Sequence, residues 1–312
     1  MRFALLFPGQ GSQSVGMLGA LAARHAVVRE TFAEASAALS YDLWQLVSEG
    51  PADMLDRTEH TQPALLAAGV AVWRTWRALG GPEPDAMAGH SLGEYTALVC
   101  ASALSFADAL RLVERRGQLM QAAVPAGSGA MAAIVGLDDE QVRAVCAESA
   151  QGEVVEAVNF NAPGQVVVAG HHTAVERAAT LAKARGAKLT KVLPVSVPSH
   201  CSLMRPAAEQ LAQDLQAVAV QPPAIPVLHN LDATPRSRPE DIRAALVAQL
   251  HSPVQWVKTI QALRAQGAAA LLECGPGRVL TGLTKRIDKA ANGECLQDPQ
   301  TLEAGLALVR GS

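Results

Sequence analysis

The chain has 312 residues, a length that suits one large domain or a large domain that carries a small insertion. Lys and Arg number 26 and Asp and Glu number 29, so the net charge is −3, and no long basic run indicates a nucleic-acid partner. No apolar run approaches the roughly 20 residues that cross a bilayer, so we expect no membrane partner either.

The cysteines indicate a reducing compartment. There are five, an odd number that argues against a disulfide framework, and no two are spaced as Cys-x-x-Cys. They are Cys100, Cys146, Cys201, Cys274 and Cys295. We therefore expect free thiols in a cytoplasmic protein and no zinc site.

The first part of the chain alternates short apolar runs with helical patterns. Arg2–Phe7 is too short for the core of a signal peptide and predicts a buried strand, after which two glycines flank Gln10 in a loop. The next predicted elements are helical segments over Gly16–Val47, a polar connection over Ser48–Leu55, a helix over Pro63–Leu79, a strand over Asp85–Gly89, and helices over Leu92–Cys100 and Ser105–Ala123. Pro63 is expected at the first helical position, where a missing N–H does no harm.

A different pattern follows the Gly- and Pro-rich segment at residues 124–129. Its predicted elements are strand Met131–Val135, helix Asp139–Ala147, strands Val154–Asn159 and Gln165–Ala169, helix Thr173–Arg185 and strand Lys188–Val192. This order is the split β-α-β, or ferredoxin-like, pattern. It predicts a small inserted α+β domain over residues 126–196, and a large α/β domain formed by residues 1–125 and 197–312.

The remaining sequence returns to alternating helices and strands. Helices are predicted over Leu203–Val218, Pro239–Leu250, Val257–Gln266, from Gly277 to Ile287 and over Leu302–Val309, and strands over Ile225–Leu228 and Ala269–Glu273. Such alternation predicts a parallel sheet, whose active site gathers at the carboxyl ends of the strands. Positions just after predicted strands are therefore expected to converge: Gln10, Ser91, the residues near Asn230, and Gly275.

Ser91 is the candidate nucleophile. It lies in Gly89-His90-Ser91-Leu92-Gly93, between a predicted strand and a predicted helix. A serine on such a sharp turn exposes its hydroxyl, and the adjacent helix N-terminus favours developing negative charge. The alternative is a buried serine at the end of a strand.

A nucleophilic serine needs a base, and His200 is the best candidate among the eight histidines. It lies in the Pro-fixed, mostly apolar segment Val195–Cys201, where the chain re-enters the large domain; His229 and His60 are the alternatives. His90 neighbours Ser91, but its side chain is expected to point away. A third group should orient the base, and the sequence offers either Asp232 or a backbone carbonyl.

Arg116 is expected on the apolar face of its helix, because stepping back along the helix leads to Leu112. A buried guanidinium stays charged and needs an anionic partner. Either an internal carboxylate, such as Glu94 or Glu114, or the carboxylate of a substrate can supply that charge.

Several segments occur in the order typical of one family: Phe7–Gln13 (FPGQGSQ), Gly89–Glu94 (GHSLGE), Arg116-Gly117, Asn159–Gln165 (NFNAPGQ), Pro198–His200 (PSH), Gln249 and Gly275–Gly277 (GPG). Together they resemble the malonyl-CoA:acyl carrier protein transacylases of bacterial fatty acid synthesis over nearly the whole chain. The resemblance implies a large α/β-hydrolase-like domain with an inserted ferredoxin-like subdomain. It also implies that Ser91 takes the acyl group as an ester, that His200 is its general base, and that the backbone carbonyl of Gln249 orients His200.

The resemblance assigns the remaining roles as well. Gln10 and the backbone N–H of Leu92 would form the oxyanion hole, and Arg116 would bind the malonyl carboxylate. Malonyl-CoA would then acylate Ser91, and the phosphopantetheine thiol of acyl carrier protein would remove the malonyl group, in ping-pong fashion. No metal, nicotinamide or flavin is required, and a monomer is expected. Carrier proteins are acidic, so basic residues are candidates for docking them: Lys188, Lys191, Lys285 and Arg286.

Three other functions use the same residues differently. A serine hydrolase shares the Gly-x-Ser-x-Gly pattern, but it has no need of Arg116 and normally shows a downstream Asp-then-His order that is not found here. An acyltransferase of a polyketide or malonate decarboxylase system would differ only in its carrier protein. A non-catalytic module that binds carrier proteins is disfavoured, because all the candidate catalytic residues are present.

Overall fold

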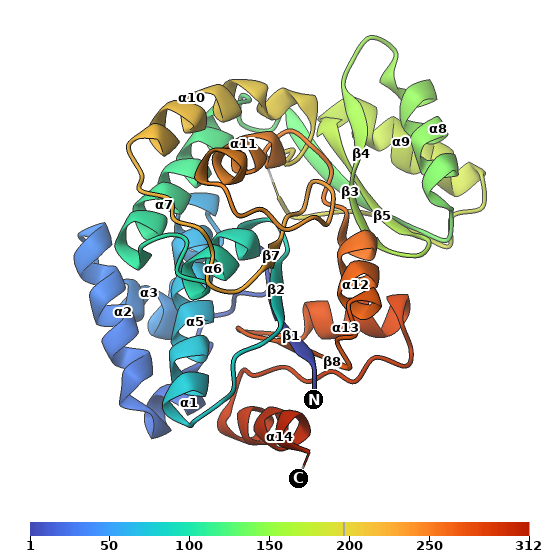
Figure 1. Ribbon diagram of the computed structural model, residues 1–312. Helices are drawn as coiled ribbons and strands as arrows, with labels where there is room; N and C mark the ends of the chain where they lie inside the picture. The colour runs from blue at the N-terminus through green and yellow to red at the C-terminus, as the bar shows by residue number, and fades with distance from the viewer. Residues whose placement is uncertain (196, 312) are drawn as a thin grey trace.

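Two four-stranded sheets organise the chain, of which the computed structural model describes residues 1–195 and 197–311. The first sheet has the strand order β7-β2-β1-β8 and is parallel (Figure 1). Its strands are β1 (Phe3–Phe7), β2 (Ala86–Gly89), β7 (Val227–Leu228) and β8 (Ala270–Glu273). The predicted α/β class with a parallel sheet is confirmed.

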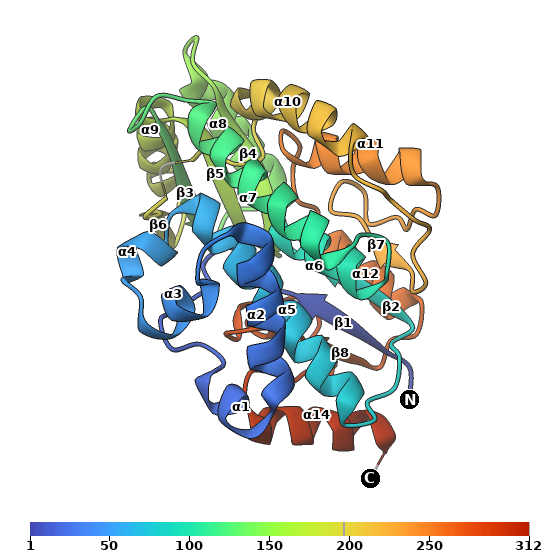
Figure 2. The same cartoon turned by 90° about the vertical axis from the view of Figure 1, so that its left-hand side faces the viewer.

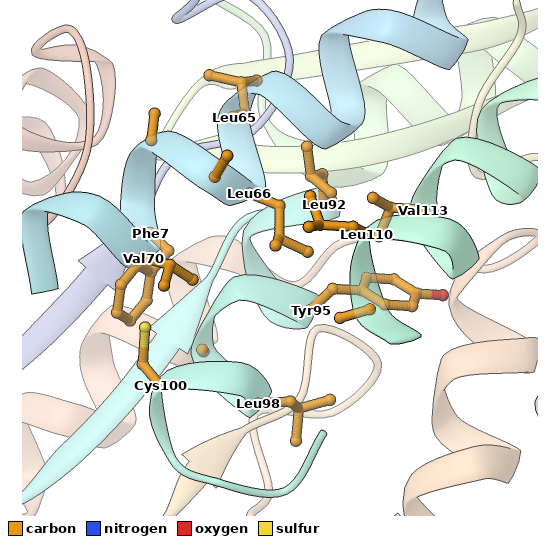
Figure 3. Packing of buried hydrophobic residues seen from close by; sticks show 14 of the residues in the cluster. Phe7, Leu65, Leu66, Val70, Leu92, Tyr95, Leu98, Cys100, Leu110 and Val113 are labelled. Carbon is orange, nitrogen blue, oxygen red and sulfur yellow. The ribbon is translucent and has the colours of Figure 1, made fainter. Parts of the chain in front are cut away.

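Helices cover both faces of the parallel sheet, which is why β1 is apolar along its whole length. The helices on the two faces are α2 (Ala26–Leu39), α5 (Thr58–Ala78), α6 (Leu92–Cys100) and α7 (Phe106–Ala122) on one, and α12 (Trp256–Ala265) and α13 (Val279–Ile287) on the other. Phe3, Leu5 and Phe7 pack into the first core, and Figure 3 shows part of that cluster. Ala4 and Leu6 alternate with them and pack into the second core.

The second sheet is antiparallel and has the strand order β4-β5-β3-β6. Its elements are β3 (Gly129–Val135), α8 (Asp139–Ala150), β4 (Val155–Ala162), β5 (Gln165–His171), α9 (His172–Ala184) and β6 (Leu189–Val192). Ala130, Ala132 and Ile134 pack with α8 and α9, whereas Met131 faces the other side, where it meets Cys201. One face of this sheet is thus covered by its own helices, and the other turns toward the rest of the chain (Figures 1 and 2).

The separate apolar cluster of the second sheet favours the predicted division into residues 126–196 and the rest, which stays a prediction. The boundary at residue 196 and the C-terminal residue 312 lie outside the described residues. The remaining elements are α1 (Gly19–Arg24), α3 (Leu43–Glu49), α4 (Ala52–Leu55), the 3₁₀ turn η1 (Ser202–Met204), α10 (Arg205–Gln216), α11 (Pro239–Gln249) and α14 (Pro299–Arg310). Within the described ranges, no helix is both long and apolar enough to cross a membrane.

Two local predictions were wrong in the same region. The connection expected over Ser48–Leu55 contains α4, and α5 begins at Thr58 rather than at Pro63. Pro63 therefore lies inside the helix, where it forgoes one backbone hydrogen bond. Tertiary packing outweighs this loss, because the first turns of α5 are buried against α7: a Cβ on Gly117 would lie 2.7 Å from the Cα of Glu59.

Candidate active site

Ser91 lies on a strained turn between β2 and α6. Its φ of 51° and ψ of −109° place it outside the usual regions for a non-glycine residue. The flanking glycines allow this turn, because a Cβ on Gly89 would lie 1.9 Å from the backbone of Gly93, and one on Gly93 would lie 2.0 Å from the Phe7 carbonyl oxygen. The side chain of Asn230 closes the turn, since its Oδ1 accepts from the Ser91 N–H (2.6 Å) and its Nδ2 donates to the Gly89 oxygen (2.6 Å).

The hydroxyl of Ser91 meets His200, which the sequence analysis selected as the base. Ser91 Oγ lies 2.8 Å from His200 Nε2, and His200 Nδ1 lies 2.7 Å from the backbone oxygen of Gln249. Because that carbonyl can only accept, Nδ1 carries the proton and Nε2 is free to accept one from the serine. Burial, and then the positive charge of Arg116, lower the pKa of His200 to about 3, so the imidazole is neutral at pH 7.

Arg116 reaches the same place from α7. It is 1% exposed, and its guanidinium donates to Gln62 Oε1 (2.7 Å), Gln249 Oε1 (3.0 Å) and Ser91 Oγ (3.1 Å). Burial lowers the pKa of Arg116, but a guanidinium remains protonated in proteins. Among the described residues no carboxylate pairs with it, so the internal ion pair with Glu94 or Glu114 that the sequence left open is not formed.

The alternative bases and the alternative acid lie elsewhere. His229 Nδ1 contacts Glu94 Oε1 (2.7 Å), and His60 Nδ1 lies 3.4 Å from the Tyr41 hydroxyl. Asp232 pairs with Arg236 at 2.8 Å instead of orienting a histidine. His90, which neighbours Ser91 in the sequence, lies with its Nε2 2.8 Å from Asn161 Oδ1. In the described part of the chain, only His200 contacts the Ser91 hydroxyl through an imidazole nitrogen.

A cavity of about 120 Å³ opens over Ser91, between the carboxyl edge of the parallel sheet and the second sheet. On the side of the parallel sheet, the cavity is lined by residues that include Gln10, Thr58 and Leu92. On the other side it is lined by residues of the second sheet and of the segment that follows β6: Met131, Asn159, Leu193 and Val195. Gln10 lies at the rim, where its Nε2 approaches Thr58 Oγ1 at 3.5 Å. Leu92 is the first residue of α6, so its N–H is one of the free donors of a helix N-terminus.

Sequence reasoning missed two contributors. Gln62 gave no signal, because it lies in the polar segment that was expected to precede the helix, yet it holds one arm of Arg116. Glu94 was considered as an ion-pair partner of Arg116, whereas it accepts from His229, Asn230 and Gln249. In the described residues, no group of three or more His, Cys, Asp or Glu side chains is placed to hold a metal ion.

A serine on a strand-to-helix elbow, within hydrogen-bond distance of a neutral histidine and beside a helix N-terminus, is the arrangement typical of enzymes that form acyl-serine esters. The chain belongs to the acyl transferase domain family, whose model matches residues 4–295. It is 57% identical over 305 residues to the malonyl CoA-acyl carrier protein transacylase of Salmonella typhimurium, covering 98% of this chain and 99% of that protein. It is 42% identical to the transacylase of the same name from Bacillus subtilis, over 99% of this chain and 98% of that one.

Solved structures agree with these relatives. An acyl carrier protein S-malonyltransferase from Vibrio cholerae superimposes with a TM-score of 0.96 at 57% identity, covering 98% of this chain and 100% of that one. A malonyl-transacylase in complex with a type II polyketide synthase acyl carrier protein superimposes with a TM-score of 0.98 at 54% identity, covering 99% and 100%. The two-sheet architecture is therefore that of these enzymes.

Proposed function

We propose that this chain transfers a malonyl group from malonyl-CoA to the phosphopantetheine thiol of acyl carrier protein, through a malonyl ester on Ser91, and so supplies fatty acid synthesis. The observation that carries the proposal is Arg116, a buried cation that has only neutral hydrogen-bond partners among the described residues and touches the nucleophile. Such a charge fits an acyl group that brings its own carboxylate. The names of the relatives support the same donor and acceptor.

In the first half-reaction, His200 accepts the Ser91 proton while Oγ attacks the thioester carbonyl carbon. The oxyanion that forms is stabilised by the Leu92 N–H and by Gln10, in our proposal. When the tetrahedral intermediate collapses, the C–S bond breaks and the imidazolium returns its proton to the CoA sulfur. The products are CoA thiol and malonyl-Ser91.

The second half-reaction reverses these steps with a different thiol. His200 accepts the proton of the phosphopantetheine thiol, the sulfur attacks the ester carbonyl, and the proton passes to Ser91 Oγ as the C–O bond breaks. The same residues serve both directions, so no cofactor or metal enters the chemistry. Exposed basic residues near the second sheet and on α13 are our candidates for docking the carrier: Lys188, Lys191, Lys285 and Arg286.

Arg116 provides the selectivity in this proposal. A malonyl carboxylate pairs with the guanidinium, whereas an acetyl group leaves it with glutamine oxygens only. We also propose that the protein works as a monomer and in the cytoplasm. The five free and buried cysteines favour such a reducing compartment.

The test is the intact mass of the protein after brief exposure to malonyl-CoA, followed by addition of acyl carrier protein. We expect a malonyl adduct on the wild type and on Ser199→Ala, a control serine that lines the same cavity, but not on Ser91→Ala. Added carrier should discharge the adduct and become malonylated. Release of free malonate without transfer would instead indicate a hydrolase, and carrier binding without any adduct would indicate a docking module.

A further inference from the structure

A buried chain of polar side chains runs behind the nucleophile and ends on Arg116. Glu94, the third residue of α6, is 1% exposed, and Gln249, the last residue of α11, is equally buried. Glu94 Oε2 accepts from Gln249 Nε2 at 3.0 Å, and Gln249 Oε1 accepts from Arg116 Nη2 at 3.0 Å. The side chain of Gln249 thus links an anion to a cation, separately from its backbone oxygen, which serves His200.

The hydrogen-bond partners of the Gln249 side-chain amide are compatible with only one of its two orientations. Nε2 donates to Glu94 and also to the backbone oxygen of Ser91 (3.1 Å), both of which can only accept. A flipped Gln249 would point its oxygen at the carboxylate and its N–H groups at the guanidinium. The carboxylate of Glu94 therefore fixes the amide so that its oxygen faces Arg116.

Glu94 is itself held firmly by two further donors. His229 Nδ1 lies 2.7 Å from Oε1, and the backbone N–H of Asn230 donates to Oε2 at 2.8 Å. These contacts come from the loop after β7, so the position of the carboxylate does not depend on Gln249 alone. Its negative charge compensates Arg116 through one intervening amide, and the guanidinium remains free of any direct carboxylate among the described residues.

The anchored guanidinium is prepared for a substrate. Gln62 holds Nη1 and Gln249 holds Nη2, so the guanidinium is fixed with Nη2 directed at Ser91 Oγ, where the acyl group must arrive. An arginine without these anchors would lose side-chain freedom on binding the carboxylate, which weakens binding. A direct ion pair with Glu94 would occupy the guanidinium instead.

We propose that the side chain of Gln249, oriented by Glu94, is a positioning residue that holds Arg116 ready for a carboxylated acyl group. The inference rests on the proposed function, since it assumes that Arg116 binds the malonyl carboxylate. It assigns to Gln249 a role in acyl selectivity that is separate from the orientation of the His200 imidazole by its carbonyl.

The test compares two acylation rates of Ser91: with malonyl-CoA, and with p-nitrophenyl acetate, a neutral ester that brings no carboxylate for Arg116 to bind. Gln249→Met keeps the volume and the backbone carbonyl but removes the amide. We expect the ratio of its malonylation rate to its rate with the neutral ester to fall about tenfold or more. The matched control is Gln297→Met, whose amide oxygen accepts from the Gly277 N–H and which should keep the wild-type ratio of rates.

A second variant separates Glu94 from a general structural role. Glu94→Gln should lower the ratio of the two rates to a value between wild type and Gln249→Met, because a neutral amide no longer dictates the orientation of Gln249. The double variant should have the ratio of Gln249→Met, since both changes act through one side chain. An unchanged ratio in Gln249→Met, or a further loss in the double variant, would overturn the proposal. Failure of the proposed function looks different: wild type would react with the neutral ester but take no malonyl group.

Discussion

The two walls of the active-site cavity are built on opposite principles. On the side of the parallel sheet, charged and polar side chains are buried in mutual contact, and Ser91 and His200 both have positive φ values. On the side of the second sheet, the core consists mostly of alanine and valine, and the cavity wall is formed mostly by apolar residues such as Met131 and Leu193. We therefore expect the chemistry to depend on the first wall, where small displacements matter, and the second wall to shape the space.

The largest expected effect comes from a glycine on the strained wall. Gly89→Ala would place a Cβ 1.9 Å from the Gly93 backbone, so β2 and α6 must separate and Ser91 must leave its turn. We expect the free energy of unfolding to fall by at least about 3 kcal/mol, and Ser91 acylation to be lost. In the second sheet, Gly164→Ala meets nothing closer than 3.7 Å and strains only a φ of 69°, which costs about 1 kcal/mol.

For both variants, urea unfolding gives the free energy of unfolding, and the intact mass of the malonyl adduct gives the acylation of Ser91. If Gly164→Ala lost as much stability as Gly89→Ala, or also lost acylation, the contrast between the walls would be wrong.

The next effect concerns selectivity. Arg116→Ala removes the buried cation from the strained wall, and we expect malonylation of Ser91 to slow about 100-fold or more, because a bidentate charge-assisted contact is lost. The rate with acetyl-CoA should not fall in parallel, since the acetyl group has no carboxylate for Arg116 to bind. Competition between the two thioesters, read by intact mass, gives the ratio directly. An equal loss with both would mean that Arg116 supports the Ser91 hydroxyl and not the acyl group.

The pH dependence tests the electrostatics of the same wall. His200 must be neutral to act as a base, and its pKa is lowered to about 3 by burial and by Arg116. Acylation by p-nitrophenyl acetate should therefore stay nearly level from pH 8 to pH 5, whereas a histidine with the ordinary pKa of about 6.5 would lose about 30-fold at pH 5. A tenfold fall per pH unit below 6.5 would contradict this.

The lowered pKa of His200 also predicts how the stability of the fold changes with pH. Below pH 6.5 the unfolded chain binds a proton at residue 200 that the folded chain does not, so stability falls as the pH falls toward 3. Wild type should lose about 2 kcal/mol more than His200→Gln between pH 7 and pH 5, as measured by urea unfolding.

Much of the fold follows from hydrophobic periodicity, and much of the site from chain position. The predicted helix Leu92–Cys100 matches α6 at both ends, because glycine spacing and an apolar run define it locally. Residues expected after strands, such as Ser91 and Asn230, do converge, because the ends of parallel strands share one edge. The predicted start of α5 was wrong, because tertiary packing overrode the preference of Pro63 for the first position of a helix.

The part of the site that could not be predicted consists of contacts between residues that lie far apart in the sequence and belong to no recognisable motif. Gln249 lies 155 positions from Glu94, and Arg116 lies 54 positions from Gln62. Nothing in the local sequence distinguishes these glutamines from others on amphipathic helices. Whether Arg116 meets an internal carboxylate also could not be decided from spacing, since that depends on where His229 and Asn230 bring their donors.

The smallest expected effect lies on the second wall, at two asparagines of β4. Asn161 Oδ1 contacts His90 Nε2 at 2.8 Å, whereas the buried Oδ1 of Asn159, which lines the cavity, has no hydrogen-bond partner among the described residues. The ionised malonyl thioester has no N–H or O–H group to donate to this oxygen, but the pantetheine arm carries amide N–H groups and is common to CoA and the carrier. We therefore expect Asn159→Ala to slow both half-reactions equally, by about threefold to tenfold, with little change in stability.

Asn161→Ala is the matched control for this prediction. It removes a hydrogen bond that already exists within the protein, so it should lower the free energy of unfolding by about 1 kcal/mol and change both rates less than Asn159→Ala does. A slower reaction with malonyl-CoA alone would place Asn159 against the acyl group instead of the shared arm. Loss of stability in Asn159→Ala would mean that even the apolar wall depends on a polar contact, and the contrast between the two walls would weaken.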